Sequence, residues 1–251
     1  MVCRVLLWLD IWSTLHCMTV KVKFTDTIKG IPEEYHPVPA RKVIPEWYKN
    51  LPPYMNGNKE VLTGDLTGKT SATVKKCMPV FDALTSGYIL YTPCDVDVSN
   101  KDGAPWYTWP DFEIISWHPP HQIKGHPEAS GFPAPKWRNP WAIQTPKGYS
   151  CLFLPPLHRE SVFKIFEGVV DTDTYSYPVE LPFALNDPEW TGIIPAGTPM
   201  AQVIPFKRDS YALEIGSMEE EKERQESLFR NLKSTFFNAY KEKFWIKKEY
   251  N

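Results

Sequence analysis

The sequence predicts a mainly β fold built from short antiparallel strands. Short apolar runs bounded by Pro, Gly or polar turns occur at Tyr149–Leu154, Phe163–Val170, Val179–Leu185, Ile193–Ile194 and Ala201–Phe206. Runs of this length and spacing are typical of a barrel or a sandwich. No amphipathic helix of crossover length separates them, which excludes a βαβ unit and a parallel sheet.

Composition limits the class of protein. A chain of 251 residues with 42% hydrophobic content can bury its core as one β-rich domain. The net charge of −2 gives no overall electrostatic attraction for nucleic acid or for an anionic membrane. Five cysteines without a C-x-x-C pair indicate free thiols and argue against a zinc site.

Residues 1–17 form a segment of their own. Their apolar run is interrupted by Asp10 and is too short for a membrane span, and no small-x-small cleavage site follows it. An alternating strand, Lys21–Phe24, begins soon after Met18. We interpret residues 1–17 as an upstream extension; a signal or membrane anchor is the alternative.

The rest of the chain divides into three parts. Residues 18–70 hold the first strand and a proline-rich arm, residues 71–213 the β-barrel, and residues 214–251 a C-terminal helix. Trp47 and Tyr48 are expected on one helical turn of the arm, clamped across the domain; an exposed recognition surface is the alternative.

The first barrel strands are expected among residues 79–84, 88–92 and 95–98. An aromatic-rich hairpin is expected from residues 106–110 and 112–117.

Two loops carry residue types that bind ligands. His118, His121 and His126 could ligate a divalent metal, but prolines flank two of them and no carboxylate follows at strand spacing, so no metal site is predicted. Trp137 and Arg138 belong to a run that alternates cations with aromatics, a pattern that can stack a base or a sugar ring. Packing of Trp137 in the core is the competing interpretation.

The C-terminal part is expected to be a single helix from Ser217. The acidic run 219–221 suits the positive end of a helix. The apolar residues that recur at helical spacing are Phe229, Leu232, Phe236 and Tyr240. This stripe should pack on the barrel or on a neighbouring subunit.

Four segments resemble motifs of the trimeric dUTPase family. Gly168–Tyr175 resembles its G-[VI]-I-D-x-D-Y turn, and Gly197–Gln202 resembles its G-D-R-I-A-Q segment. Thr85–Tyr91 resembles S-A-G-Y-D-L-Y, and Pro156–Ser161 stands where that family has its P-R-S-S phosphate loop. The resemblance implies a trimeric β-clip or jelly-roll-type barrel and nucleoside triphosphate pyrophosphatase activity with magnesium as the cofactor.

The resemblance also implies site residues. Asp171 would orient the attacking water and hold the sugar, and Tyr175 would stack beneath the deoxyribose. Arg159, Ser161 and Gln202 become candidates for ligand binding.

Several positions depart from the dUTPase pattern. Thr174 is an extra residue in the turn, and Glu160 adds a negative charge to the phosphate loop. Ile89 replaces the aspartate on the magnesium side, and Pro199 replaces an arginine. Because phosphoryl chemistry depends on cations and metal to cancel charge, these changes favour a structural role for Asp171 in its turn.

The whole chain, including Pro45–Lys49 and the Lys75–Pro79 approach to Asp82, resembles a family encoded by tailed phages, cyanophages among them. The leading interpretation is a phage-encoded, non-catalytic β-barrel protein for binding or assembly, either a virion component or a host-takeover factor. It would act in the host cytoplasm or the virion. We expect a homo-oligomer, which the dUTPase resemblance implies is a trimer. We also expect an unidentified protein partner and no cofactor. A nucleotide-binding pyrophosphatase or phosphatase is the alternative.

Overall fold

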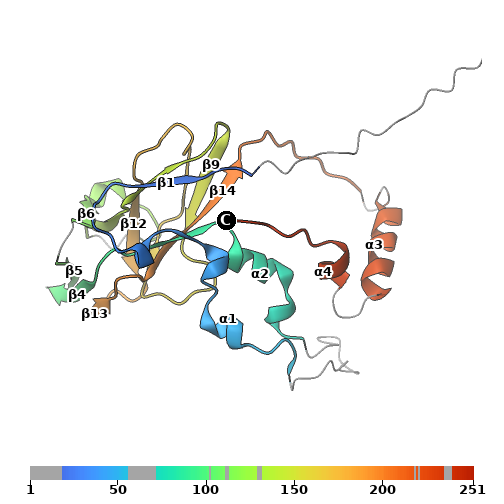
Figure 1. Cartoon of the computed structure of the whole chain (residues 1–251), viewed down its shortest axis with the longest axis horizontal. Helices are drawn as coiled ribbons and strands as arrows, with labels where there is room; N and C mark the ends of the chain where they lie inside the picture. Colours follow the sequence, from blue (N-terminus) through green and yellow to red (C-terminus); the bar gives the residue numbers. More distant parts are fainter. Residues whose placement is uncertain are drawn as a thin grey trace, which may run out of the picture.

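The structure is a computed structural model that describes residues 19–55, 72–101, 103–110, 113–128, 132–217, 219, 221–234 and 239–251, with the backbone alone at 229–234 and 239. The extension 1–17 and the side chains of Phe229, Leu232 and Phe236 lie outside this description. Four antiparallel sheets make up most of the described chain, which confirms the mainly β prediction (Figure 1).

The largest sheet has five strands in the order β11-β9-β14-β3-β2. They are β2 (Val38–Pro39), β3 (Tyr88–Tyr91), β9 (Tyr149–Leu154), β11 (Gly168–Val170) and β14 (Pro199–Lys207). A four-stranded sheet has the order β10-β12-β7-β6, with β6 (Ile115–His118), β7 (Ala134–Arg138), β10 (Phe163–Ile165) and β12 (Glu180–Leu185).

The two smaller sheets complete the β structure. One has three strands in the order β13-β4-β5, namely β4 (Val96–Lys101), β5 (Ala104–Thr108) and β13 (Gly192–Ile194). The other pairs β1 (Lys23–Asp26) with β8 (Trp141–Gln144). Among the described strands the sheets stay separate, so the expected closed barrel is not seen.

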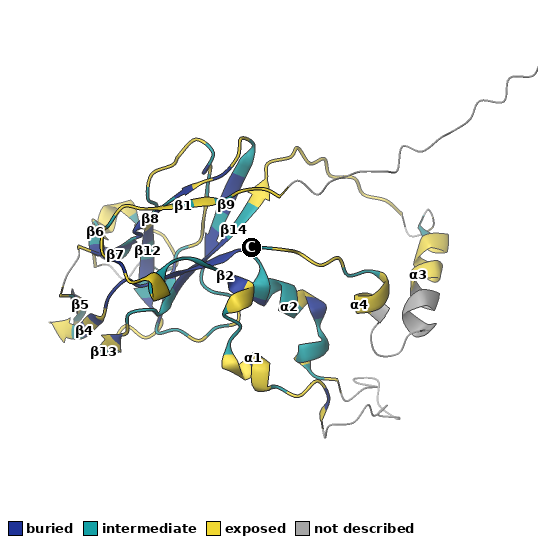
Figure 2. Ribbon diagram, viewed as in Figure 1, coloured by how far each residue is buried: buried dark blue, intermediate teal, exposed yellow. Residues whose placement is uncertain are grey.

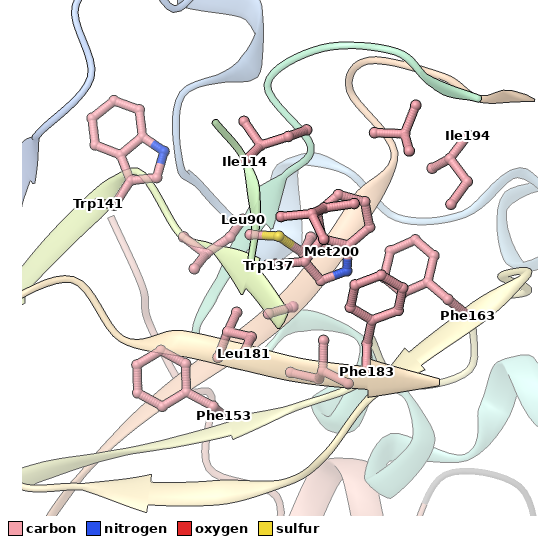
Figure 3. Close-up of a cluster of buried hydrophobic side chains, with 14 of the residues drawn as sticks. Leu90, Ile114, Trp137, Trp141, Phe153, Phe163, Leu181, Phe183, Ile194 and Met200 are labelled. Atoms are coloured by element: carbon pink, nitrogen blue, oxygen red, sulfur yellow. The ribbon is translucent and has the colours of Figure 1, made fainter. Parts of the chain in front are cut away.

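One hydrophobic core joins the four sheets into a single unit. Trp137 of β7 stacks on Phe183 of β12 with ring centroids 4.6 Å apart, and Phe163 of β10 packs against both rings (Figure 3). Residues of the other three sheets, such as Ile143, Phe153 and Ile194, belong to the same buried cluster. Such shared burial is what stabilises short strands that could not stand alone.

Two β expectations are wrong in detail. Phe163–Val170 is not one strand, because β10 and β11 belong to different sheets. The aromatic hairpin does not form either, since β5 pairs with β4 and β6 pairs with β7. Lys101 pairs with Ala104, and the two-residue turn between them ends in Gly103 at φ +81°. The turn of this hairpin therefore lies upstream of the aromatic run, whose first residues, Trp106 and Tyr107, belong to β5.

Four α-helices are described: α1 (Glu46–Asn50), α2 (Met78–Thr85), α3 (Lys222–Ser234) and α4 (Ala239–Lys243). Short 3₁₀ turns occur at Glu33–Tyr35, Ala40–Lys42, Val74–Lys76 and Pro120–Gln122. None of the described helices is long and apolar enough to cross a membrane.

Helix α2 corrects the expected strand at residues 79–84. Pro79 lies in the first turn, where its missing N–H removes no helical hydrogen bond. The buried residues of this helix are Met78 and Leu84.

The proline-rich arm is clamped on its own domain, as the sequence predicted. Trp47 and Tyr48 both lie on α1. The indole N–H of Trp47 donates to the carbonyl of His158 at 2.9 Å, and the hydroxyl of Tyr48, which is buried, donates to the carbonyl of Lys75 at 3.2 Å.

The C-terminal helical part begins later than the expected Ser217. After β14 the chain runs in an extended course to α3, which begins at Lys222, and the residues between α3 and α4, 235–238, lie outside the described part of the chain (Figure 1). The tail then returns to α2, where the indole N–H of Trp245 lies 3.0 Å from each carboxylate oxygen of Asp82. Trp245 also packs against Phe81.

Candidate functional site

The Asp171–Tyr175 turn, the candidate catalytic segment, is closed by a charged network. Asp171 Oδ1 accepts from the hydroxyl of Ser150 at 2.6 Å and lies 3.0 Å from Arg208 Nη1. Asp173 accepts from Arg208 Nη1 at 2.8 Å and from the amide of Gly148 at 2.8 Å. Its side chain is 2% exposed, against 60% for Asp171. Arg208 therefore ties both carboxylates to the end of β14.

This network lowers the pKa of both carboxyl groups. Arg208 and the amide of Gly148 lower the pKa of Asp173 to about 2. Ser150 and Arg208 hold the pKa of Asp171 below its ordinary value. A general base works best when its pKa is close to the operating pH, so both groups are weak bases near neutrality.

The Asp173 pKa predicts an acid-dependent loss of stability. The carboxyl titrates near 3.8 when unperturbed and near 2 in the fold. The stabilisation is therefore present above about pH 4 and is lost as the pH falls from about 4 to 2. Asp173→Asn should unfold at a lower temperature than wild type at pH 7, and the gap should narrow across this window in thermal scans. Asp26→Asn, on the exposed edge of β1, serves as the control; a gap that stays constant down to pH 2 would contradict the assignment.

Tyr175 keeps an exposed ring at the end of the same turn. Its amide donates to the carbonyl of Asp171 at 2.8 Å, and its side chain is about half exposed. The extra Thr174 also binds that carbonyl, through its hydroxyl at 3.1 Å. The insertion is thus accommodated by capping the turn, and the ring remains available to a partner.

Gln202, a candidate ligand residue, is fully buried in β14. Its carbonyl oxygen accepts from the amide of Leu157 at 2.9 Å. Its amide nitrogen donates to the carbonyl of Ala83 at 2.9 Å and to that of Ser86 at 2.7 Å. The side chain therefore fixes the end of α2 and the 155–158 turn to the central strand.

Ser161 and Arg159 follow this turn. The hydroxyl of Ser161 accepts from the amide of Phe163 at 3.3 Å, so it caps the start of β10. Arg159 is different: its Nε and Nη2 atoms are buried and have no hydrogen-bond partner in the described part of the chain. Burial lowers the pKa of this guanidinium, while nearby Tyr91 acts in the opposite direction. Because unpaired buried donors are costly, these nitrogens leave Arg159 with unused capacity to bind an acceptor.

The structure does not bring the two candidate groups together within one chain. Arg159 lies near Tyr91, which pairs with Pro199 at the start of β14. Asp171 lies beside Arg208, which follows the last residue of β14. A strand of nine residues spans about 26 Å at about 3.3 Å per residue. A site that used both Asp171 and Arg159 would have to combine two copies.

Trp137 and Arg138 are occupied by the protein itself. Trp137 is enclosed in the core and offers no ring face to a ligand. Arg138 pairs with Glu113 at 2.6 Å and lies 3.7 Å from Glu180. Alternation along β7 explains this, because neighbouring side chains of a strand point to opposite faces.

The histidine loop does not assemble a metal site. His118 lies 2.5 Å from the side-chain oxygen of Gln122, and His126 stacks on Phe166 with centroids 4.4 Å apart. Within the described residues, no group of three His, Cys, Asp or Glu side chains is placed to hold a metal ion.

The structure also contains a cavity that the sequence did not predict. A cavity of about 530 Å³ is lined by β5 and by β6, β7 and β12, so it lies between two sheets. Its aromatic lining consists of Trp106, Tyr107, Trp117, Phe132, Phe166 and Phe183, and five prolines complete it. We call it the aromatic pocket. The only sequence signal was the aromatic run 106–117, which was interpreted as a hairpin.

No protein-family model matches this chain, and no match was found among the curated proteins. The function must therefore be inferred from the geometry.

Proposed function

We propose that this chain is a non-catalytic protein that acts by binding and assembly. The observation that supports this most directly is the network around Asp171 and Asp173, in which Ser150, Gly148 and Arg208 engage both carboxylates. The carboxylates stabilise a turn and have lowered pKa values. Groups used in this way are poorly suited to take a proton from an attacking water.

The resemblance of the whole chain to a tailed-phage family supports a role as a virion component or a host-takeover factor, in the virion or the host cytoplasm. Assembly as a homo-oligomer is supported by the exposed segment after β14, where Tyr211, Leu213 and Ile215 face solvent. Large apolar side chains gathered on a surface mark an interaction site more often than they mark a free surface.

This proposal predicts that purified protein does not hydrolyse dUTP or other deoxynucleoside triphosphates in the presence of magnesium. Pyrophosphate release should equal the background, because Asp171 is a weak base and buried Ile89 offers no oxygen to magnesium. Asp171→Ala should give the same rate as wild type. Release that exceeds the background and disappears in Asp171→Ala would overturn the proposal.

The second candidate is a nucleotide-binding enzyme on a dUTPase-like β-clip or jelly-roll-type barrel. The buried, unpartnered nitrogens of Arg159 favour it, because a phosphate would supply the missing acceptors. In such an enzyme, Arg159 of one copy would face Asp171 and Tyr175 of another. Saturable dUTP binding that is lost in Arg159→Leu but kept in Arg138→Leu would support this candidate.

A further inference from the structure

The segment from Asp209 to Ser217 has the alternating pattern of a strand but lies outside the four sheets. Every residue in it is exposed, and the chain follows an extended course from β14 toward α3 (Figure 2). Tyr211, Leu213 and Ile215 alternate with small or polar residues and are 86%, 89% and 87% exposed. Alternating apolar side chains are typical of a strand with one buried face. We call this segment the arm.

The aromatic pocket has the properties of a site for such an arm. Its lining is almost entirely aromatic, aliphatic or proline, and its volume of about 530 Å³ falls in the range of pockets that enclose ligands, about 300–1,000 Å³. Trp106 and Trp117 expose part of their rings there. On one side the pocket is bordered by β5, which is the outer strand of its sheet. An outer strand can pair with an added extended segment whose alternate side chains enter pockets.

The charges around the arm and the pocket are complementary. Residues 209–221 contain five acidic residues and no basic one. At the pocket, the ammonium group of Lys101 lies 4.3 Å from the ring centroid of Trp106. The carboxylate in the lining, Glu128, is already paired with Lys164 at 2.7 Å. The rim therefore favours an acidic segment over a basic one.

The arm leads away from the pocket of its own chain. Arg208 is fixed by its amide, which donates to the carbonyl of Gly148 at 2.8 Å, and by its ion pair with Asp173. Tyr211 is three residues further on, which allows a reach of about 11 Å at most. Strands β4, β5 and β6 lie at the opposite end of the long axis from the side where the arm leaves β14 (Figure 1).

We infer that the arm of one copy docks in the aromatic pocket of a second copy, with Tyr211, Leu213 and Ile215 buried against the pocket. This inference rests on the proposed assembly function and names its interface. Because the arm and the pocket are different surfaces of the chain, the contact is head-to-tail. Repetition of a head-to-tail contact produces a closed ring, or a filament when the rotation does not close.

The first test uses the full chain and measures mass by light scattering. The arm variant combines Tyr211→Ser, Leu213→Ser and Ile215→Ser, and the pocket variant is Trp106→Ala. Wild type should be an oligomer and each variant a monomer. Ala212→Ser, on the other face of the arm, should keep the wild-type mass. The thermal midpoint of a monomeric arm variant should show a folded domain, since its changed side chains are exposed.

Mixing the two variants gives the sharpest result. The pocket variant has an intact arm and the arm variant an intact pocket, so a one-to-one mixture can form a single junction. We expect a species of twice the chain mass and nothing larger. If the pocket variant does not fold, Trp117→Ala, at the same pocket, replaces it. An arm variant that retains the wild-type oligomer overturns the docking while leaving the assembly proposal intact.

A monomeric wild type would overturn the assembly proposal, and a peptide then decides the docking separately. A synthetic peptide of residues 208–217 should bind wild type and bind Trp106→Ala at least tenfold more weakly. Equal binding to the two proteins, or no binding to wild type at millimolar peptide, overturns the docking.

Discussion

Gln202→Leu is expected to lower the free energy of unfolding by about 3–6 kcal/mol. The substitution keeps roughly the volume of the side chain but removes three hydrogen bonds, to the amide of Leu157 and to the carbonyls of Ala83 and Ser86. A buried backbone group left without a partner costs about 1–3 kcal/mol, and because these three groups are part-buried the expected loss lies in the lower part of the sum. Urea unfolding monitored by tryptophan fluorescence measures the loss directly.

Two further variants show whether the hydrogen bonds are the cause. Gln202→Glu keeps an acceptor for Leu157 but directs a carboxylate oxygen at two carbonyls, so it should be less stable than Gln202→Leu at pH 7. Part of the loss should be recovered on acidification, because a protonated carboxyl can donate to one carbonyl. Gln144→Leu, exposed on β8, should stay within about 0.5 kcal/mol of wild type. If Gln202→Leu also stays within that margin, the three hydrogen bonds of Gln202 add nothing to stability.

The strands whose burial is set by local sequence were predictable. Tyr149–Leu154 was predicted with the bounds that β9 has, because a Pro-Pro pair ends its apolar run. Strands β12 and β14 were also found near their predicted positions. In each case the apolar residues and the Pro, Gly or polar turn residues that end the strand are neighbours in sequence. The local pattern is therefore enough to predict the strand.

Features that depend on distant partners were not predictable in the same way. Nothing in the run Phe163–Val170 shows that its two halves join different sheets, since strand pairing is decided elsewhere in the chain. The resemblance of Gly197–Gln202 to a dUTPase motif made Gln202 a candidate for ligand binding, whereas its three hydrogen-bond partners lie 45 to 119 positions away in sequence. The aromatic pocket is likewise formed by several strands that only the fold brings together.

Gly87→Ala is expected to lower the free energy of unfolding by about 2–5 kcal/mol. It acts at the junction where α2 and β3 meet β14. Gly87 follows α2 at φ +70°, and an added Cβ would lie 2.0 Å from the carbonyl oxygen of Val203 in β14. The left-handed conformation costs a residue with a Cβ about 1–2 kcal/mol, and overpacking adds about 1–3 kcal/mol. The carbonyl of Gly87 also accepts from the amide of Ala40 at 2.9 Å. A shift of the backbone at Gly87 would therefore also strain the hydrogen bond that attaches the proline-rich arm.

Gly30→Ala separates the two contributions. Gly30 has φ +85° and nothing within 4 Å of the added Cβ, so this variant should lose only the conformational part, about 1–2 kcal/mol. The difference between the two variants in urea unfolding then measures how tightly α2 and β3 are seated on β14. Because Gly87 is the neighbour of Ser86, whose carbonyl binds Gln202, Gly87→Ala and Gln202→Leu should combine less than additively. Additive losses would show instead that the steric contact and the buried hydrogen bonds stabilise the junction independently.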